Sequence, residues 1–335
     1  MQLILALPAL FEERDDSAAS FPAPGLAHVI TLAGTPERRT GGIDAALAAH
    51  YGVERQNDWP LAPVRLAALG VEPADGYWLV ADPVTVEVGL ATAELAGIVG
   101  DLDRMETDAL VATLNRHFAS DELAFVAPRP SRVFVRAATA TRLSTVAASA
   151  ALRRPLRPLL PQGRDAANWR RWQSEIEMLL HEHPVNVERE RTGRAQVNGF
   201  WFSQGGTLPP LRQPAARIAT FANDGIAGAL AAFAGAPADP LPPGLSDALA
   251  AAGPVDSIVA ALDSALDLAS IERAWAAPAR AALGAGSLDS VQIVTESAGD
   301  AVVWHAGRPR LWQRITGRFE TRNLRALLDA ARQVT

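Results

Sequence analysis

The chain opens with a short apolar run and then changes to helical spacing. Residues 2–7 read QLILAL and end at Pro8, a pattern typical of a central strand that is covered on both faces. Apolar residues recur at helical spacing in residues 42–52 and again in 59–70, and each stretch ends at a glycine. The pattern predicts a buried first strand followed by two amphipathic helices.

The pattern changes between residues 77 and 138, where short strands surround one helix. Strands are predicted at 77–80, 84–88, 123–126 and 133–136, with a helix at 107–118. The order β-β-α-β-β is typical of a small two-layer unit. We therefore expect an inserted subdomain at residues 75–149, and a main α/β domain made of residues 1–74 and 150–335.

The second half of the chain alternates strands with helices. Strands are predicted at 197–202, 217–221, 257–262 and 291–295, and helices at 225–234, 268–283 and 321–332. This alternation favours an α/β fold, with one sheet that carries helices on both faces. The Ala-, Pro- and Gly-rich stretch at 235–254 is predicted to be a surface loop.

Composition narrows the possible chemistry. The 335 residues suffice for two average domains or for one large domain with an insertion, and 49% hydrophobic residues are ordinary for a globular protein. The absence of cysteine excludes disulfides, thiolate catalysis and sulfur-ligated metal sites. Any metal ion would therefore be held by His, Asp or Glu.

The apolar start is too short for a membrane segment. It covers about ten residues, no Lys or Arg precedes it, and a charged stretch at residues 12–16 follows, so it is not typical of a signal peptide. No apolar run reaches the roughly 18 to 20 residues that span a membrane. We expect a cytoplasmic protein without a membrane partner.

The charge distribution also bears on possible partners. A formal net charge of -6 gives no electrostatic footprint for nucleic acid, so no nucleic-acid partner is expected. Arginines nevertheless gather ahead of the segment described next, at Arg153, Arg154, Arg157, Arg164, Arg170 and Arg171. They form either a solvated helix face or a rim that attracts anions.

One segment, residues 165–206, contains several polar side chains of the kinds that bind ligands. A helix with an apolar face at Trp169, Trp172, Ile176 and Leu179 leads to His183. The candidate binding residues of this segment are His183, Asn186, Arg189, Asn198, Trp201, Gly205 and Gly206.

Two interpretations of this set are open. An arginine fork, amide donors and backbone N–H groups freed by glycines suit a phosphorylated or carboxylate small molecule. The same residues also suit a structural corner, in which His183 caps backbone groups, Asn198 bridges a turn and Trp201 lies in the core.

The segment resembles the archaeal-type cofactor-independent phosphoglycerate mutases. There a helix is followed by His-Pro-Val-Asn and then by Arg, Gly, Asn, Trp and a glycine-rich turn, and in this chain the order is similar from His183 to Gly205. The likeness covers residues 40–235. Uncharacterised proteobacterial proteins, some of them named as regulatory proteins, are similar as well and share the LPQG stretch at 160–163.

The resemblance implies an alkaline phosphatase-like fold and a specific reaction centre. In the mutases two divalent metal ions, such as Mn or Zn, work with a phosphorylatable serine. The first strand of the family ends in Asp-Gly, but here Pro8-Ala9 follow, and Ile43 stands where the serine is expected, beside Thr40 and Asp44. After Ser257 the one histidine is His305, and no Asp-His pair occurs.

The remaining titratable residues offer little replacement for the missing metal ligands and the missing serine. Asp256, Asp263 and Asp267 flank a predicted strand and form either a carboxylate site or a helix cap with surface acids. His117 and His305 are predicted to be structural or surface histidines. The motif also departs from the family at 203–204, where Ser-Gln replaces an aromatic residue and glycine.

Three functions remain. The first is a mutase-like protein that lost the two-metal site and acts in binding or regulation, with no catalytic residue and no cofactor. The second is an active phosphoglycerate mutase-type phosphotransferase with a rearranged site that uses a divalent metal. The third is a structural or interaction protein, in which the alanine- and leucine-rich helices form an oligomer interface.

Overall fold

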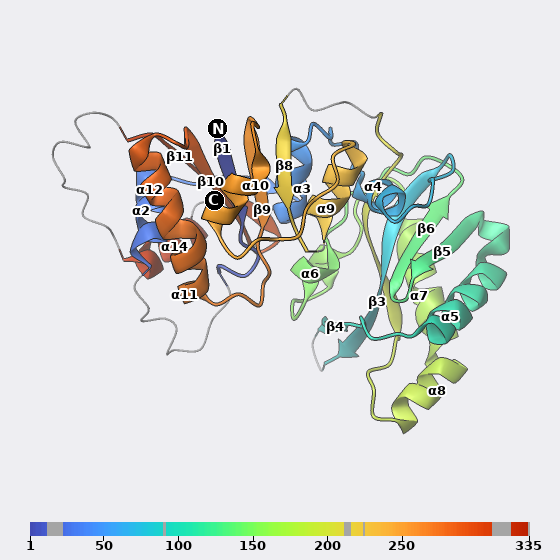
Figure 1. Ribbon diagram of the computed structural model, residues 1–335. Helices are drawn as coiled ribbons and strands as arrows, with labels where there is room; N and C mark the ends of the chain where they lie inside the picture. Colours follow the sequence, from blue (N-terminus) through green and yellow to red (C-terminus); the bar gives the residue numbers. More distant parts are fainter. Residues whose placement is uncertain (12–22, 90–91, 211–215, 224, 310–322, 334–335) are drawn as a thin grey trace. The chain divides into compact units, whose positions relative to one another are not determined.

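The computed structural model describes residues 1–11, 23–89, 92–210, 216–223, 225–309 and 323–333. The chain forms two compact units, the first from residues 1–52 and 211–335 and the second from residues 53–210. Each unit contains one β-sheet (Figure 1). The charged stretch at 12–16 lies outside the described residues.

The first unit is built on a six-stranded sheet with the order β2-β11-β10-β1-β9-β8. Its strands are β1 (Gln2–Ala6), β2 (Glu37–Thr40), β8 (Ile218–Phe221), β9 (Ser257–Ala261), β10 (Ser290–Ser297) and β11 (Asp300–Gly307). β1 lies between β10 and β9 and runs parallel to both, while β11 and β2 continue the sheet antiparallel. The prediction of a central first strand is confirmed.

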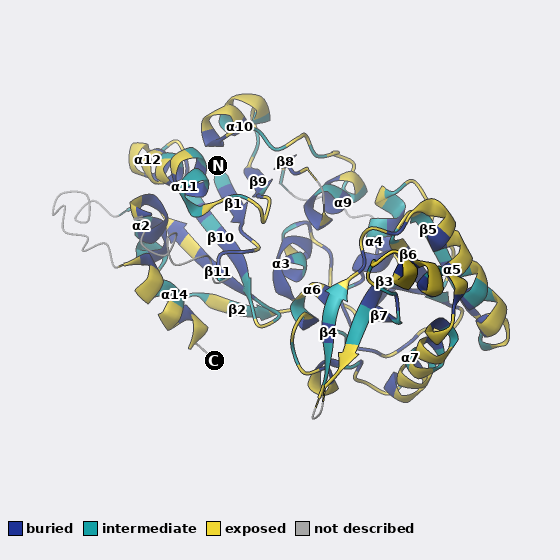
Figure 2. Cartoon of the chain, turned by 90° about the horizontal axis from the view of Figure 1, so that it is seen from below, coloured by how far each residue is buried: buried dark blue, intermediate teal, exposed yellow. Residues whose placement is uncertain are grey.

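Helices cover both faces of this sheet. They are α2 (Pro24–Ala33), α3 (Gly42–His50), α9 (Ile226–Phe233), α10 (Leu245–Ala252), α11 (Leu268–Ile271), α12 (Ala277–Ala285) and α14 (Leu324–Arg332). Leu3 and Leu5 of β1 join a core with α2 and α12. Ile4 and Ala6 are also buried, and Figure 2 shows α2 and α3 on opposite sides of β1 and β10. The predicted α/β class is confirmed.

Two predictions in this unit were wrong. The stretch 235–254 is not wholly a loop, because α10 forms there and buries Leu245 and Ala248 on one face. The segment 268–283 is not one regular helix. It consists of α11, a π-helical turn at Glu272–Ala276 and α12, and the turn places the side chain of Glu272 in the interior.

The second unit contains β3 (Tyr77–Val88), β4 (Ala93–Ile98), β5 (Leu123–Arg129), β6 (Arg132–Ala137) and β7 (Gly199–Gly206). The order is β4-β3-β6-β5, and β7 pairs with β3. α5 (Arg104–His117) starts with a capping box formed by Asp103 and Glu106. The order β-β-α-β-β is present at residues 77–137, but the two strands predicted at 77–80 and 84–88 form the single strand β3. The second strand of the order, β4, was not predicted.

β7 corrects a further prediction, because we expected this strand in the same sheet as β1. Its backbone pairs antiparallel with β3, from Trp78–Gly206 to Val84–Gly199. Contacts of this kind place residues 150–210 in the second unit. The boundaries expected at 74/75 and 149/150 therefore fall inside the second unit.

The remaining helices of the second unit are α4 (Leu61–Ala68), α6 (Ala148–Ala151), α7 (Ala166–His181), α8 (Pro184–Arg191) and two 3-10 turns at Phe118–Asp121 and Arg157–Leu159. α7 forms as predicted, and its Trp169 and Ile176 share a core with Phe200 and Phe202 of β7. In the described part of the chain, no helix has the length and apolar character needed to cross a membrane.

Candidate functional site

His183 is the N-cap residue of α8. Its Nδ1 accepts a hydrogen bond from the backbone N–H of Val185 (3.3 Å), and its Nε2 lies 3.0 Å from Oγ1 of Thr113 on α5. Because Nδ1 accepts, the proton of the neutral ring is on Nε2, which donates to Thr113. Burial, aided by the charge of Arg116, lowers the pKa of His183 and favours this neutral form. His183 thus joins α8 to α5.

Asn186 connects the end of α7 to the segment before β7. Its side-chain nitrogen donates to the carbonyl oxygens of Leu180 (2.8 Å) and Val197 (2.7 Å), and its oxygen accepts from the N–H of Val197 (2.9 Å). The side chain is 2% exposed. Both amide hydrogens are therefore used inside the protein.

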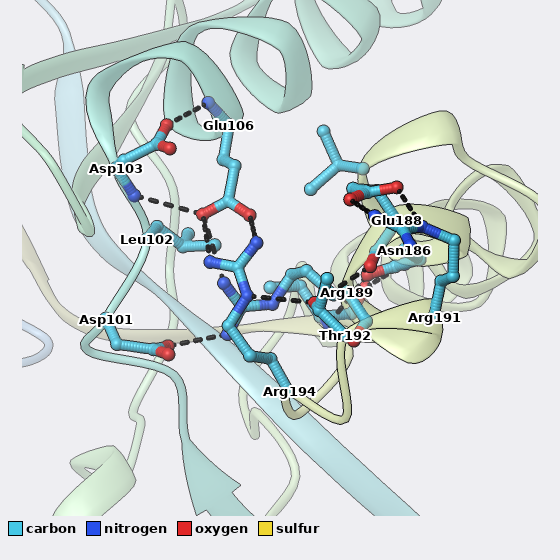
Figure 3. A network of polar contacts seen from close by, with 12 residues as sticks. Asp101, Leu102, Asp103, Glu106, Asn186, Glu188, Arg189, Arg191, Thr192 and Arg194 are labelled. Atoms are coloured by element: carbon cyan, nitrogen blue, oxygen red, sulfur yellow. Dashed lines mark hydrogen bonds and ion pairs between the residues drawn. The ribbon is translucent and has the colours of Figure 1, made fainter.

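Arg189 is buried and lies at the centre of an ion-pair network (Figure 3). Its Nη1 donates to Glu106 (3.0 Å), its Nη2 to Asp101 (2.6 Å) and its Nε to the carbonyl oxygen of Ala195 (2.6 Å). Arg194 also donates to Glu106, at 2.7 Å. The Arg189 side chain is 0% exposed, so the carboxylates that surround its guanidinium belong to the chain itself.

Asn198 and Trp201 bind neighbouring backbone. Asn198 accepts from the N–H of Val86 (2.7 Å) and donates to the carbonyl oxygen of the same residue (2.8 Å). Trp201 donates its indole N–H to Val146 (2.7 Å) and packs in an apolar cluster with Val84. The Asn198 contacts lengthen the pairing between β3 and β7, whereas the Trp201 contact joins β7 to the segment before α6.

Gly205 and Gly206 allow close packing at the end of β7. A Cβ atom on Gly205 would overlap the phenol ring of Tyr77, and one on Gly206 would overlap Pro60. The N–H of Gly205 points to the carboxylate of Asp58 at 3.4 Å. Asp58 is 5% exposed, and burial raises its pKa.

The seven predicted residues therefore divide into two groups. His183, Asn186 and Arg189 lie together where α7, α8 and α5 meet. The other four lie on β7 or directly before it. Their contacts agree with the interpretation as a structural corner. Anion binding by these residues stays a prediction.

The position of the expected nucleophile is at the start of α3. The N-cap residue Gly41 has a left-handed backbone, and the N–H of Ile43 donates to Oε2 of Glu296 at 3.3 Å. A Cβ atom on Gly42 would overlap the Glu296 carboxylate, so glycine permits this close approach. Sequence reasoning missed Glu296, although it directly follows the predicted strand 291–295.

A second glutamate caps α2 in the same manner. Glu272, from the π-helical turn, accepts hydrogen bonds from the N–H groups of Gly25 (2.6 Å) and Leu26 (3.0 Å). Glu272 is 5% exposed. The N-termini of both α2 and α3 are thus bound by carboxylates of the chain, which complement the positive ends of the helix dipoles.

The three late aspartates make separate local contacts. Asp256 precedes β9 and accepts from the N–H of Arg217 (2.9 Å), whereas Asp263 and Asp267 follow the strand. Asp263 accepts from Ala265, and Asp267 is the N-cap residue of α11 and accepts from Ser270 at 2.7 Å. Asp256 therefore lies at the opposite end of β9 from the other two.

The other candidate residues also lie apart from one another. His117 contacts Glu175 at 3.2 Å, His305 is exposed on β11, and Thr40 pairs with Asp300 at the edge of the first sheet. Asp44 lies in the first turn of α3. Among the described residues, no three His, Asp or Glu side chains come close enough together to hold a metal ion.

Comparison with solved structures gives likenesses of low identity, among them the two described below. No protein-family model and no curated protein matches the chain. A cofactor-independent phosphoglycerate mutase from Thermoplasma acidophilum is 13% identical, with a TM-score of 0.43, over 98% of this chain and 99% of that one. The PH0037 protein from Pyrococcus horikoshii is 13% identical, with a TM-score of 0.49, over 91% of this chain and 87% of that one.

Proposed function

We propose that the chain is a phosphoglycerate mutase-like protein that has lost two-metal phosphoryl transfer and acts in binding or regulation. The motif from His183 to Gly205 and the α/β fold support the family relationship. One observation carries the loss of chemistry, namely the contact between Glu296 and the N–H of Ile43 at the start of α3.

Two features at the start of α3 oppose phosphoryl transfer, namely the negative charge of Glu296 and the lack of a nucleophilic atom on Ile43. A helix N-terminus favours an anion, because its N–H groups are unpaired and its dipole is positive there. Here Glu296 already supplies that negative charge, and it would repel an incoming phosphate group. Ile43 has no nucleophilic atom, so the side chain at the position of the family's serine cannot accept a phosphoryl group.

A structural or interaction protein is the second candidate. The observation that favours it is the burial of Arg189 among Glu106, Asp101 and Ala195, since these contacts organise the corner without a ligand. The two candidates differ in one respect. A binding protein must gain stability from its ligand, whereas a purely structural protein gains none.

Metal analysis and thermal unfolding test the proposal together. The full chain is purified with Mn and Zn supplied, and its metal content is measured by mass spectrometry after desalting. We expect no stoichiometric metal, and a rise in unfolding temperature with a phosphorylated or carboxylate metabolite. Stoichiometric Mn or Zn would contradict the loss of the site, and no stabilising metabolite would favour the structural candidate.

A further inference from the structure

An arginine cluster forms around the turn at residues 161–164 in the second unit. Ser144 and Gln162 exchange two backbone hydrogen bonds of 2.9 and 3.0 Å, which hold the segments on either side next to each other. A Cβ atom on Gly163 would overlap the carbonyl oxygen of Arg142. The backbone of Arg142 therefore lies against this turn, directly beside Arg164.

Arg170 joins the same turn from the first helical turns of α7. Its Nη1 donates to the carbonyl oxygen of Pro161 at 3.4 Å, which brings the guanidinium to the residue before Gln162. The side chains of Arg142, Arg164 and Arg170 are all exposed. Three exposed arginine side chains thus begin on three segments that meet at this turn.

The cluster is not neutralised by nearby acids. Within the described part of the chain, neither Arg142 nor Arg164 forms an ion pair with a carboxylate. Asp165 is the acid of this turn, and one of its oxygens accepts from the backbone N–H of Arg142 at 2.8 Å. The first turn of α7 adds no acidic residue. The local charge is therefore clearly positive in a chain whose net charge is -6.

Three of the other arginines named from the sequence do not take part. Arg171 pairs with Asp121 and Glu175, and Arg154 donates to the carbonyl oxygen of Ala150. Arg153 lies beside β4, where its backbone N–H donates to Leu95. The arginines that are close in the sequence are thus separated in the structure. Arg142, from a different segment, lies beside Arg164 instead.

We propose that Arg142, Arg164 and Arg170 form a binding site for a phosphate monoester group of a small molecule. Guanidinium groups bind phosphate oxygens through paired N–H donors, and several of them match a doubly charged group. The hydrogen-bonded loop fixes where these side chains begin and so reduces the entropy lost on binding. The site rests on the proposed function and deepens it, because it names where the phosphate group of a bound metabolite is held.

Calorimetric titration of the full chain tests this site, with phenyl phosphate as the probe and inorganic phosphate as a second arm, at constant ionic strength. Arg164→Gln is the first variant, because no contact of its side chain is lost in the described structure. We expect its affinity for phenyl phosphate to be about tenfold weaker than that of the unchanged chain. The triple variant Arg142→Gln, Arg164→Gln and Arg170→Gln should lose binding.

Arg129→Gln is the matched control, because Arg129 is an exposed arginine of the same unit, on β5, and its loss changes the net charge equally. Its affinity should equal that of the unchanged chain. Inorganic phosphate that binds as tightly as phenyl phosphate would identify free phosphate as a ligand of the same site. The proposal is overturned if the unchanged chain does not bind either probe, or if the triple variant binds as the unchanged chain does.

Discussion

Arg189 and Glu106 form an ion pair of 3.0 Å whose guanidinium is fully buried and whose carboxylate is 11% exposed. Glu106 also completes the capping box of α5, where it accepts from the N–H of Asp103 at 3.0 Å. One glutamate thus starts α5 and holds α8 against it (Figure 3).

Replacing Arg189 tests the structural importance of the pair. Arg189→Ala leaves Glu106 buried, with Arg194 as its one remaining cationic partner among the residues that the structure describes. Loss of one member of a buried pair costs roughly 3–5 kcal/mol, so we expect the free energy of unfolding to fall by about 3 kcal/mol. Urea denaturation followed by circular dichroism measures this change.

Arg191→Ala is the matched control on the same helix. Arg191 pairs with Glu188 at 2.6 Å, but both side chains are exposed, and exposed pairs contribute little. The unfolding free energy should remain nearly the same. Equal effects of the two substitutions would show that burial of Arg189 does not matter to stability.

His183 predicts an acid-sensitive contact between α8 and α5. Burial lowers its pKa below 6.5 in the folded state, so the folded chain binds fewer protons at this site than the unfolded chain. Its contribution to stability is complete above pH 6.5 and is lost as the pH falls through the lowered folded pKa. His183→Asn keeps an N-cap acceptor but does not titrate.

The measurement is the free energy of unfolding against pH, for the unchanged chain and for His183→Asn. The decline of the unfolding free energy below pH 6.5 should be smaller in the variant, because His183 no longer titrates. Part of the decline should remain in both proteins, because burial also lowers the pKa values of His28 and His50. Identical slopes for the two proteins would show that His183 does not contribute to the pH dependence of stability.

Gly205→Ala tests close packing at the end of β7. The added methyl group overlaps the ring of Tyr77, and overpacking of this kind costs about 1–3 kcal/mol. Gly228→Ala is the control, since its Cβ meets no atom within 4 Å in α9 and alanine favours a helix. Thermal unfolding should show a lower midpoint for the first variant only. A normal midpoint for Gly205→Ala would mean that Tyr77 moves freely.

The pattern of apolar residues predicted the fold better than it predicted strand partners. Residues 3–7 are apolar at every position, so a central parallel strand was the natural interpretation. β7 contains the apolar run 200–202, and nothing in its sequence distinguishes pairing with β3 from a place beside β9. The strand with which a given strand pairs is determined by tertiary contacts, and the local periodicity of the sequence carries no information about them.

The candidate site shows the same limit. The residues from His183 to Gly206 were recognisable by their spacing, but their partners Thr113, Glu106 and Val86 lie far away in the sequence. Glu296 and Glu272 were missed because a carboxylate that caps a distant helix has no local sequence signal. The glycines at 41–42 were the available sign that another group approaches α3 closely.

The most direct measurement for the central claim is phosphorus NMR of 3-phosphoglycerate incubated with the full chain and either Mn or Zn. Glu296 at the N-terminus of α3 and Ile43 in place of serine predict that the substrate signal stays unchanged over time. A growing signal of 2-phosphoglycerate, absent without the protein, would contradict the loss of phosphoryl transfer.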